Sequence, residues 1–484
     1  MKLWKILEDV EILSLNLVDV ECNIVGLALK SSEVKKGFMF FAIKGETHDG
    51  NDYINEAIRN GASCVISETK HTNISSVEVR DVRIAMATIS SNYYDSRHKQ
   101  HKIIVATGTN GKTTTTYMLY EILKCSGQKA TLIGTRGAYI NEKNVYNGLT
   151  TPDPIILHKI IKQSYEMGVR IIIVELSAHA IYYKKLYGIC AEIGLFTNFS
   201  QDHLDFFESM EFYGSVKKYA FLNPDIRYAI INVDDDLGEE IYRERIEKGL
   251  LATTCGIKKP ADVFAIDIDM EEGIKCTINA YDEILELDTN FHGEFNLYNI
   301  LLAVAAARAL SVSSDTIING YYTMEATPGR FNIINGKTID AIVDFAHTPD
   351  GLRNLLITSR KLCKGTIILV FGCGGNRDKS KRKAMGLIAY ELADYVIITE
   401  DNSRYEDAND ITSEIAKGFN DNYFKYQIIL DRKDAIKKAC ELAKPGDIIV
   451  IAGKGDEEYL DCNGIKKAYS DKNTIEEMIR SYSL

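Results

Sequence analysis

The chain has 484 residues and a formal net charge of −11 at pH 7, so several domains are expected and a nucleic-acid-binding protein is disfavoured. No apolar run reaches the length of a membrane span, and the first residues lack the basic-then-apolar layout of a signal peptide. The ten cysteines are scattered without a CxxC pair; apolar runs around Cys190, Cys276 and Cys373 predict buried, reduced thiols and therefore a cytoplasmic protein.

Residues 1–100 are predicted to form a small N-terminal α/β domain. Strand-like runs at residues 38–45 and 62–68 flank a helix-like segment at residues 53–62. We find no internal repeat and no low-complexity tract in the chain.

A glycine-rich segment follows the next apolar run. Residues 106–113, ATGTNGKT, have the spacing of a Walker A loop, with Ala106 in place of the first glycine. Backbone N–H groups at the start of the following helix would bind a polyphosphate. Lys112 would reach the β- and γ-phosphates, and the hydroxyl of Thr113 or Thr114 would bind Mg²⁺. The alternative is an ordinary glycine-rich turn, but the strand, spacing, lysine and hydroxyl all favour nucleotide binding.

Residues 101–328 are predicted to form a central P-loop domain with a mostly parallel sheet. The runs IIIVELSAHA, AEIGLFTNFS and YAIINVDDD each end in polar residues and are followed by a helical pattern. The block ends at Pro328–Gly329, which is a plausible linker.

Residues 329–484 are predicted to form a C-terminal doubly wound, Rossmann-like domain. Four apolar runs end in charged or glycine residues, and the carboxyl ends of parallel strands meet at one crevice. Strand ends are generally polar because loops face solvent, but here both signs of charge occur together. The GxGxxG spacing is absent, which disfavours a nicotinamide oxidoreductase. The residues expected at the crevice are Arg377, Asp378, Asn402, Arg404, Glu457 and Glu458.

Several chemistry-bearing residues follow strands of the central block. Glu175 ends a strand where P-loop folds place a second metal carboxylate, and Asp202 and His203 follow another strand. Lys217 lies shortly beyond. Each taken alone could be structural, but together with the P-loop they indicate two Mg²⁺ ions shared between the γ-phosphate of ATP and an acceptor.

An ordered series of motifs now becomes informative. GTNGKTTTT, TTPDP, ELSAH, FTNFSQDHLDFF, GEFNLYNILLA, PGR, DFAHTPDG, FGCGGNRD, DNSR and AGKG occur in the order seen in Mur ligases. The chain resembles this family over essentially its whole length, and its MurE type most. The first-domain segments GETHDGNDYI and KSSEVKKGFMFFAIKG argue against the MurC and MurD types and against folylpolyglutamate synthases.

The resemblance implies a monomeric, ATP-dependent amide ligase that extends a UDP-linked muramoyl dipeptide with a diamino acid through an acyl phosphate. It implies catalytic roles for Lys112, Glu175, His203 and Lys217, with Lys217 carbamylated by CO₂. Two Mg²⁺ ions would be held by Thr113, Glu175, His203 and Lys217. ATP would be bound by Gly108, Thr109, Asn110, Gly111, Lys112, Thr113, Thr114, Asn296, Asn299, Arg330 and Asp344.

The resemblance also implies the substrate contacts. Ser31 of the first domain would contact uridine. The muramoyl dipeptide would be bound by Thr150, Thr151, Ser177 and Lys185, and the diamino acid by Arg377, Asn402, Arg404, Gly453 and Glu457. Arg404 would hold the far carboxylate of meso-diaminopimelate, and Glu457 its ammonium, so this amine is expected over lysine.

The chain departs from the family pattern mainly at positions that contact substrate. Serine replaces proline before Arg404, which is expected to loosen that turn. One alternative is therefore a Mur-fold ligase with another carboxylate acceptor or with L-lysine as the amine. A second alternative, from another class, is a non-catalytic nucleotide-binding protein. The retained metal-binding residues argue against this second alternative. The departing residues are Lys30, Ala178, Tyr183, Lys185, Ser403 and Asp456.

Overall fold

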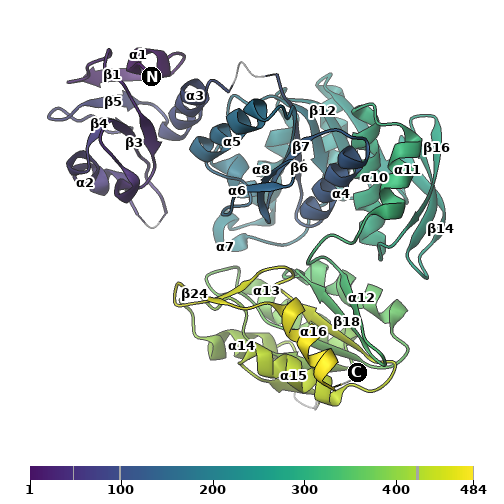
Figure 1. Cartoon of the computed structure of the whole chain (residues 1–484). Coiled ribbons are helices and arrows are strands. Elements are labelled where there is room, and N and C mark those ends of the chain that lie inside the picture. The colour runs from purple at the N-terminus through teal and green to yellow at the C-terminus, as the bar shows by residue number, and fades with distance from the viewer. Residues whose placement is uncertain (47, 97–99, 421–424, 483–484) are drawn as a thin grey trace.

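The computed structural model describes residues 1–46, 48–96, 100–420 and 425–482. Figure 1 shows an N-terminal lobe at the upper left, a central lobe beside it and a C-terminal lobe below. Each lobe contains its own β-sheet, covered by helices. The predicted class, three-domain α/β with mostly parallel sheets, is confirmed.

The N-terminal lobe contains a five-stranded sheet in the order β1-β5-β4-β3-β2, in which only β1 is antiparallel to its neighbour. The strands are β1 (Ile12–Asn16), β2 (Gly26–Ala28), β3 (Phe38–Ala42), β4 (Ala62–Ser67) and β5 (Ser76–Val79). The helices are α1 (Leu3–Ile6), η1 (Ser31–Glu33), η2 (Gly50–Tyr53), α2 (Ile54–Arg59) and α3 (Val82–Tyr94). The Asp81 side chain caps α3 by accepting from two backbone N–H groups.

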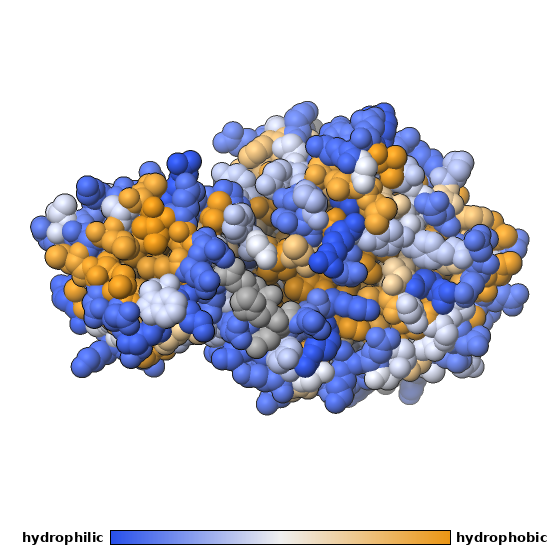
Figure 2. All heavy atoms as spheres, turned by 90° about the horizontal axis from the view of Figure 1, so that it is seen from above, coloured by the Kyte–Doolittle hydropathy of each residue, from blue (hydrophilic) through white to orange (hydrophobic). Residues whose placement is uncertain are grey.

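Hydrophobic side chains gather on the outer surface of this lobe, as Figure 2 shows from above. Leu13 and Leu15 of β1 and the following Leu17 are among the exposed hydrophobic residues. β1 lies at one end of the strand order, so it forms an edge of its sheet.

The central lobe contains an eleven-stranded sheet in the order β16-β15-β14-β13-β12-β11-β6-β10-β7-β8-β9. Its middle strands are parallel and the outer ones antiparallel. The strands are β6 (Lys102–Thr107), β7 (Ala130–Gly134), β8 (Gly137–Ile140), β9 (Lys143–Tyr146), β10 (Ile171–Glu175), β11 (Ala191–Phe196), β12 (Ile226–Asn232), β13 (Leu251–Gly256), β14 (Val263–Asp269), β15 (Ile274–Ala280) and β16 (Glu283–Thr289). The helices are α4 (Lys112–Cys125), α5 (Pro154–Glu166), α6 (Ala178–Tyr182), α7 (Leu204–Phe207), α8 (Met210–Leu222), α9 (Asp236–Glu247), α10 (Glu294–Ala309) and α11 (Ser314–Thr323).

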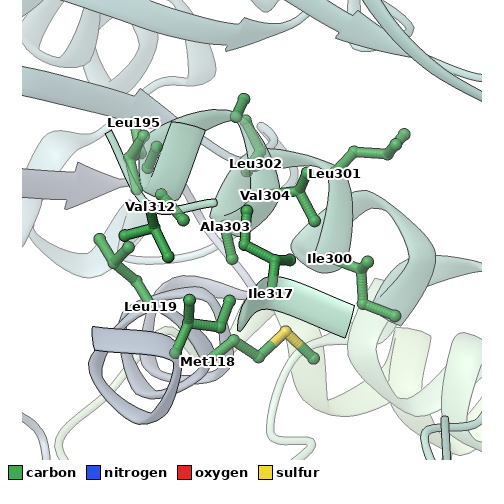
Figure 3. Packing of buried hydrophobic residues seen from close by; sticks show 14 of the residues in the cluster. Met118, Leu119, Leu195, Ile300, Leu301, Leu302, Ala303, Val304, Val312 and Ile317 are labelled. Carbon is green, nitrogen blue, oxygen red and sulfur yellow. The ribbon is translucent and has the colours of Figure 1, made fainter. Parts of the chain in front are cut away.

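The largest core of this lobe lies where α4, α10 and α11 pack together. Met118 and Leu119 of α4 lie near Ile300 and Ile317 of the other two helices (Figure 3). α10 is apolar around most of its circumference, as expected for a helix buried on several sides. This packing fixes the helix that follows the P-loop.

The C-terminal lobe contains a six-stranded sheet in the order β17-β18-β22-β19-β20-β21, parallel except for β17. The strands are β17 (Asn332–Asn335), β18 (Asp340–Asp344), β19 (Ile367–Phe371), β20 (Tyr395–Ile398), β21 (Tyr426–Ile428) and β22 (Ile448–Ala452), with a hairpin of β23 (Tyr459–Cys462) and β24 (Ile465–Ala468). The helices are α12 (Pro349–Leu362), α13 (Ser380–Leu392), α14 (Ala408–Ala416), α15 (Arg432–Leu442) and α16 (Asp471–Tyr482).

The four polar strand ends of this lobe do meet at one edge. The last residues of β18, β22, β19 and β20 pair in one row across the sheet: Asp344, Ala452, Phe371 and Ile398. The predicted convergence is therefore confirmed. The thiol prediction is only partly correct, because Cys276 and Cys373 are buried, whereas Cys190 precedes β11 and is exposed.

A buried ion pair links the last helix to the C-terminal core. Arg432 donates to both carboxylate oxygens of Asp471 at 2.8 Å, and both side chains are fully buried. Removing one partner of such a pair costs about 3–5 kcal/mol, because the other charge stays buried. We expect Asp471→Asn to lower the free energy of unfolding by about that amount in urea titrations.

The matched control is Glu477→Gln, a change in the same helix as Asp471 that removes an exposed ion pair with Lys433 of α15. That change is expected to cost at most about 1 kcal/mol. Equal losses in the two variants would contradict the structural role of the buried pair.

Candidate active site

The P-loop joins β6 to α4 with a backbone that requires glycine. Gly111 has φ +84°, and a Cβ there would lie 2.4 Å from Asn299 Oδ1. Gly111 is also the N-cap of α4 and supplies no capping side chain. The first N–H groups of a long helix are therefore directed at the loop, where an anion would accept from them.

Lys112 lies folded back over this loop. Its Nζ donates to the carbonyl oxygens of Gly108 and Thr109, each at 2.8 Å. Desolvation lowers the pKa of Lys112, and the nearby Glu175 and Asp202 partly oppose that shift. The ammonium is thus held by weak neutral acceptors, which a phosphate oxygen could replace with a stronger, charge-assisted bond.

Glu175 connects three segments around the P-loop. Its carboxylate accepts from Thr113 Oγ1 at 2.9 Å and from both the backbone N–H and the hydroxyl of Thr135 at 3.0 Å. Residue 134 must be small, since a Cβ at Gly134 would lie 2.0 Å from Glu175 Oε1. Carboxylate and hydroxyl oxygens held together in this way are the donors that Mg²⁺ prefers.

A second group of side chains lies around His203. Burial lowers the pKa of His203 to about 3, so the imidazole is neutral and able to bind a metal. Its Nε2 lies 3.4 Å from Asp202 Oδ2, and its ring centroid lies 4.9 Å from that of His179. Among the described residues, no three His, Cys, Asp or Glu side chains form a metal-binding group.

Lys217 is buried in α8. Its Nζ lies 4.7 Å from the centroid of the Tyr213 ring, and no described carboxylate forms an ion pair with it. Burial, together with the positive charge of Lys112, holds the pKa of Lys217 well below its ordinary value. The neutral form of a lysine amine is the form that reacts with CO₂, and burial favours that form, so the environment fits carbamylation.

Asp202 joins the central lobe to the C-terminal lobe. Its carboxylate lies 3.3 Å from Lys381 Nζ and 3.6 Å from His347 Nε2, both from the C-terminal lobe. Burial alone would raise the pKa of Asp202, but the hydrogen bond with His347 and the charge of Lys381 hold it well below its usual value. Asp202 is therefore an ionised, 4% exposed carboxylate between the two lobes.

Other contacts bring the C-terminal lobe onto the P-loop itself. Asn110 Nδ2 donates to Asp350 Oδ2 at 3.0 Å, and Arg330 Nη2 donates to Thr113 Oγ1 at 3.2 Å. Asp344 accepts from the backbone N–H groups of residues 331 and 346 at 2.6 Å and so fixes the chain beside Arg330. The predicted ATP residues at the lobe junction therefore lie together.

Asn296 and Asn299 lie behind the P-loop on α10. Asn299 Nδ2 donates to Asn296 Oδ1 at 3.1 Å, and Asn299 Oδ1 accepts from Thr115 Oγ1 at 3.1 Å. Both side chains are buried and support the turn at Gly111. Their contact with adenine remains a prediction.

The central-lobe residues that were predicted to bind the muramoyl dipeptide lie beside Glu175. Thr151 Oγ1 donates to the Glu175 carbonyl at 2.7 Å and accepts from the Ser177 N–H at 3.1 Å. Lys185 Nζ donates to the Thr151 carbonyl at 3.0 Å and lies 2.9 Å from Asp153 Oδ1. Thr150 is linked to the same group through Thr135, with 3.2 Å between their hydroxyls.

Ser31 lies in the N-terminal lobe, in η1. Its hydroxyl donates to Glu56 Oε2 at 2.8 Å, and its side chain is largely buried. The neighbouring Lys30 is exposed and paired with Glu33. The structure therefore assigns the Ser31 hydroxyl a bond within the lobe, and contact with uridine remains a prediction.

At the crevice of the C-terminal lobe, Lys454 organises the predicted amino-acid site. Its fully buried Nζ lies 2.9 Å from Glu457 Oε2 and 3.1 Å from Asn402 Oδ1. Asn402 Nδ2 also donates to Glu457 Oε2 at 2.8 Å. Gly453 has φ +114°, and a Cβ there would lie 2.7 Å from Asp401 Oδ2. The crevice therefore combines an oriented carboxylate with a close backbone approach.

Arg404 lies at the same edge. Its Nη1 donates to the Gly375 carbonyl at 2.6 Å, and its backbone N–H donates to the Asp461 carbonyl at 2.9 Å. These bonds hold the turn at Arg404, which has φ +51°. The loosening expected from Ser403 remains a prediction. Arg377 is exposed nearby. Desolvation is the main cause that lowers the pKa of Arg404, and the positive charge of Arg377 lowers it further.

Asp378 and Glu458 were also expected at the crevice, and other residues were missed. Asp378 Oδ1 accepts from the Ser380 backbone N–H, and the Glu458 side chain is exposed. The missed residues are Thr135, Lys381 and Lys454. Only Lys454 lies inside a quoted motif, AGKG, whereas the other two act through contacts that no local pattern indicates.

Three models of one family match successive parts of the chain. They are described as "Mur ligase family, catalytic domain" for residues 23–105, "Mur ligase middle domain" for residues 106–307 and "Mur ligase, glutamate ligase domain" for residues 329–455.

The chain belongs to the Mur ligase family.

Its relatives match it from end to end. It is 38% identical to UDP-N-acetylmuramoyl-L-alanyl-D-glutamate--2,6-diaminopimelate ligase 1 of Clostridium acetobutylicum, and the match covers 99% of each chain. It is 37% identical to the enzyme of that name from Aquifex aeolicus, over 97% of this chain and 96% of the relative. A solved structure of an enzyme with that name is 28% identical, with a TM-score of 0.71, over 100% of this chain and 99% of the other.

More distant Mur ligases share the fold. The MurF ligase of Thermotoga maritima in complex with ADP is 20% identical, with a TM-score of 0.64, over 96% of this chain and 98% of that one. No described helix of the present structure is long and apolar enough to cross a membrane.

Lys112 provides a direct test of the nucleotide site. Because the hydrogen bonds of its Nζ within the described residues go to loop carbonyls, Lys112→Ala should leave the fold intact while removing a phosphate ligand. We expect a loss of ATP affinity of at least about tenfold by isothermal titration calorimetry, with an unchanged melting temperature.

Lys102→Ala is the matched control, because this exposed lysine begins the strand that leads to the P-loop. Its ATP affinity should equal that of the unaltered protein. Normal ATP binding by Lys112→Ala would refute the P-loop assignment.

Proposed function

We propose that this Mur ligase uses ATP to join meso-2,6-diaminopimelate to UDP-N-acetylmuramoyl-L-alanyl-D-glutamate, a step in the synthesis of peptidoglycan precursors. The observation that carries the proposal is the ion pair of Asp202 with Lys381, which holds the C-terminal lobe and its crevice beside the central lobe that contains the P-loop. The printed names of full-length relatives supply the acceptor and the amine. One chain provides every candidate residue, which supports a monomer. The free, buried thiols of Cys276 and Cys373 support a reducing compartment, the cytoplasm.

The reaction would proceed in two steps. The terminal carboxylate of the muramoyl dipeptide attacks the γ-phosphorus of ATP, so that ADP leaves and an acyl phosphate forms. The amine of the diamino acid, after losing a proton, attacks the acyl carbon, and the tetrahedral intermediate expels phosphate. The protein contributes mainly position and charge neutralisation in both steps.

Each part of the site would have one task. The N-terminus of α4 and Lys112 bind the phosphates, and Arg330 approaches them from the lobe junction. Thr151, Ser177 and Lys185 hold the acceptor beside Glu175. Arg377, Asn402, Arg404, Gly453 and Glu457 bind the diamino acid, so docking of the C-terminal lobe brings the amine to the acyl group.

Two Mg²⁺ ions would each be held by a small set of donors. Thr113 and Glu175 supply adjacent oxygen donors, and neutral His203 with carbamylated Lys217 would supply the second set. When bound, the ions would neutralise charge on the transferred phosphoryl group. Thr113 meanwhile keeps Glu175 aimed at the loop, and burial keeps the Lys217 amine available for CO₂.

A different carboxylate substrate, in place of the muramoyl dipeptide, is the alternative. Tyr183 stands where the family usually has a glutamine that contacts the nucleotide substrate, and here its hydroxyl bonds to Glu46 instead. The chain would then be a Mur-fold ligase for another carboxylate. Phosphate release measured with the muramoyl-dipeptide nucleotide and with a panel of other carboxylates separates the two, since our proposal requires turnover with the former.

The carbamate at Lys217 can be tested separately. Lys217→Ala should abolish turnover, and added short-chain carboxylates should restore part of it, because they replace the lost oxygen donors. Incorporation of ¹³C-labelled CO₂ should give a carbamate resonance in the unaltered protein only. Lys218→Ala, which removes a neighbouring lysine paired with Glu240 and Glu244, is the control and should stay active. Full activity of Lys217→Ala would exclude the carbamate.

The choice of amine is tested at Arg404. Loss of a buried, charge-assisted partner costs on the order of 2–5 kcal/mol, so lysine should be used at least about 30-fold less well than meso-diaminopimelate. Arg404→Ala should remove most of that preference in kcat/KM. Arg353→Ala, an exposed arginine paired with Glu391, is the control and should retain it. Equal use of lysine by the unaltered protein would contradict the assignment of the amine.

A further inference from the structure

The turn after α6 contacts the N-terminal lobe through two successive side chains. The Tyr183 hydroxyl donates to the Glu46 carboxylate, and the Arg83 guanidinium carbon lies 4.1 Å from the centroid of the Tyr183 ring. Lys184 Nζ lies 2.7 Å from Asp81 Oδ2. Two residues of the central lobe thus contact three residues of the N-terminal lobe.

The third residue of this turn points to the acceptor group. Lys184 has φ +54°, which reverses the chain, and Lys185 follows with its Nζ bonded to the Thr151 carbonyl and paired with Asp153. Lys184 is exposed, whereas Lys185 is only 9% exposed. Residues 183–185 therefore connect the N-terminal lobe directly to the side chains around Thr151.

The contacts on the N-terminal side reach the backbone of one loop. Arg83 Nη2 donates to the Lys44 carbonyl at 3.2 Å, two residues before Glu46. Arg83 thus lies between the Tyr183 ring and the loop that carries Glu46. Asp81, which pairs with Lys184, also caps the helix that contains Arg83. These contacts form one cluster, because Asp81 and Arg83 both lie at the N-terminus of α3.

We propose that Tyr183 and Lys184 are positioning residues that bind the N-terminal lobe in the orientation needed by a long, nucleotide-linked acceptor. The inference rests on the proposed function, in which one end of the acceptor reaches Ser31 and the other reaches Thr151. An acceptor that spans two lobes binds more tightly when their relative orientation is fixed beforehand, because less ordering accompanies binding.

This cluster is more than a surface ion pair. An exposed pair such as Lys184 with Asp81 contributes little by itself. The Tyr183 hydroxyl bond to a carboxylate and the stacking of Arg83 on the ring add a charge-assisted bond and a cation–π contact at the same place. The expected effect therefore lies mainly with Tyr183.

Tyr183→Phe removes the hydroxyl and keeps the ring. We expect the KM of the muramoyl-dipeptide nucleotide to rise about fivefold to tenfold, while kcat and the KM values of ATP and the diamino acid stay unchanged. Tyr182→Phe is the control, because this adjacent, exposed tyrosine contacts only aromatic rings among its described partners. An unchanged KM in Tyr183→Phe, or an equal rise in all three KM values, would overturn the proposal.

A double-mutant cycle identifies the partner. Glu46→Gln should raise the same KM, and adding it to Tyr183→Phe should produce little further change, because both remove one bond. Fully additive effects would contradict the proposed contact.

Hydrogen exchange tests the bridge without turnover. The backbone amides near Glu46 should exchange faster in Tyr183→Phe than in the unaltered protein and in Tyr182→Phe. Identical exchange would overturn the bridge. Failure of the unaltered protein to turn over the muramoyl-dipeptide nucleotide would instead refute the proposed function, so the two failures are distinguishable.

Discussion

The buried carboxylate of Asp202 is the constraint on which the arrangement of the site depends. It faces Lys381 and His347 of the C-terminal lobe and His203 of its own lobe. Since burying an unpaired charge is expensive, Lys381 and Asp202 require one another once the lobes are in contact. The contacts of Arg330 with Thr113 and of Asp350 with Asn110 then follow at the same junction.

This junction explains how two distant sheet edges form one site. The carboxyl ends of the central strands carry the P-loop and Glu175, and those of the C-terminal strands carry Asn402 and Glu457. Each edge alone is an ordinary ligand crevice of an α/β sheet. Together they provide for phosphoryl transfer on one side and for delivery of an amine on the other, which a ligase requires.

Local patterns were sufficient to predict the three-domain α/β class and the strand ends that carry several candidate residues. Strand runs with polar ends placed Glu175, Asn402 and Arg404 correctly at sheet edges, because parallel strands bring their carboxyl ends together whatever their separation in the chain. Asp378 also follows a strand, but its Oδ1 accepts from the backbone N–H of Ser380 at the start of α13. A side chain's position after a strand does not determine its direction.

Contacts between lobes could not be predicted from the sequence. Asp456, one of the residues that depart from the family pattern, pairs with Arg136, 320 positions away, at 2.7 Å. Lys381 likewise lies just after the motif FGCGGNRD and is not part of it. Such pairs depend on how whole lobes dock, and periodicity or turn chemistry carries no information about that.

The most direct measurement is small-angle X-ray scattering of the full chain and of Asp202→Asn under the same conditions. The substitution leaves Lys381 buried without its carboxylate, so the lobes should separate and the radius of gyration should increase. Asp205→Asn, an exposed residue in α7, should scatter like the unaltered protein. Superimposable profiles for Asp202→Asn and the unaltered protein would contradict the view that this carboxylate holds the two lobes together.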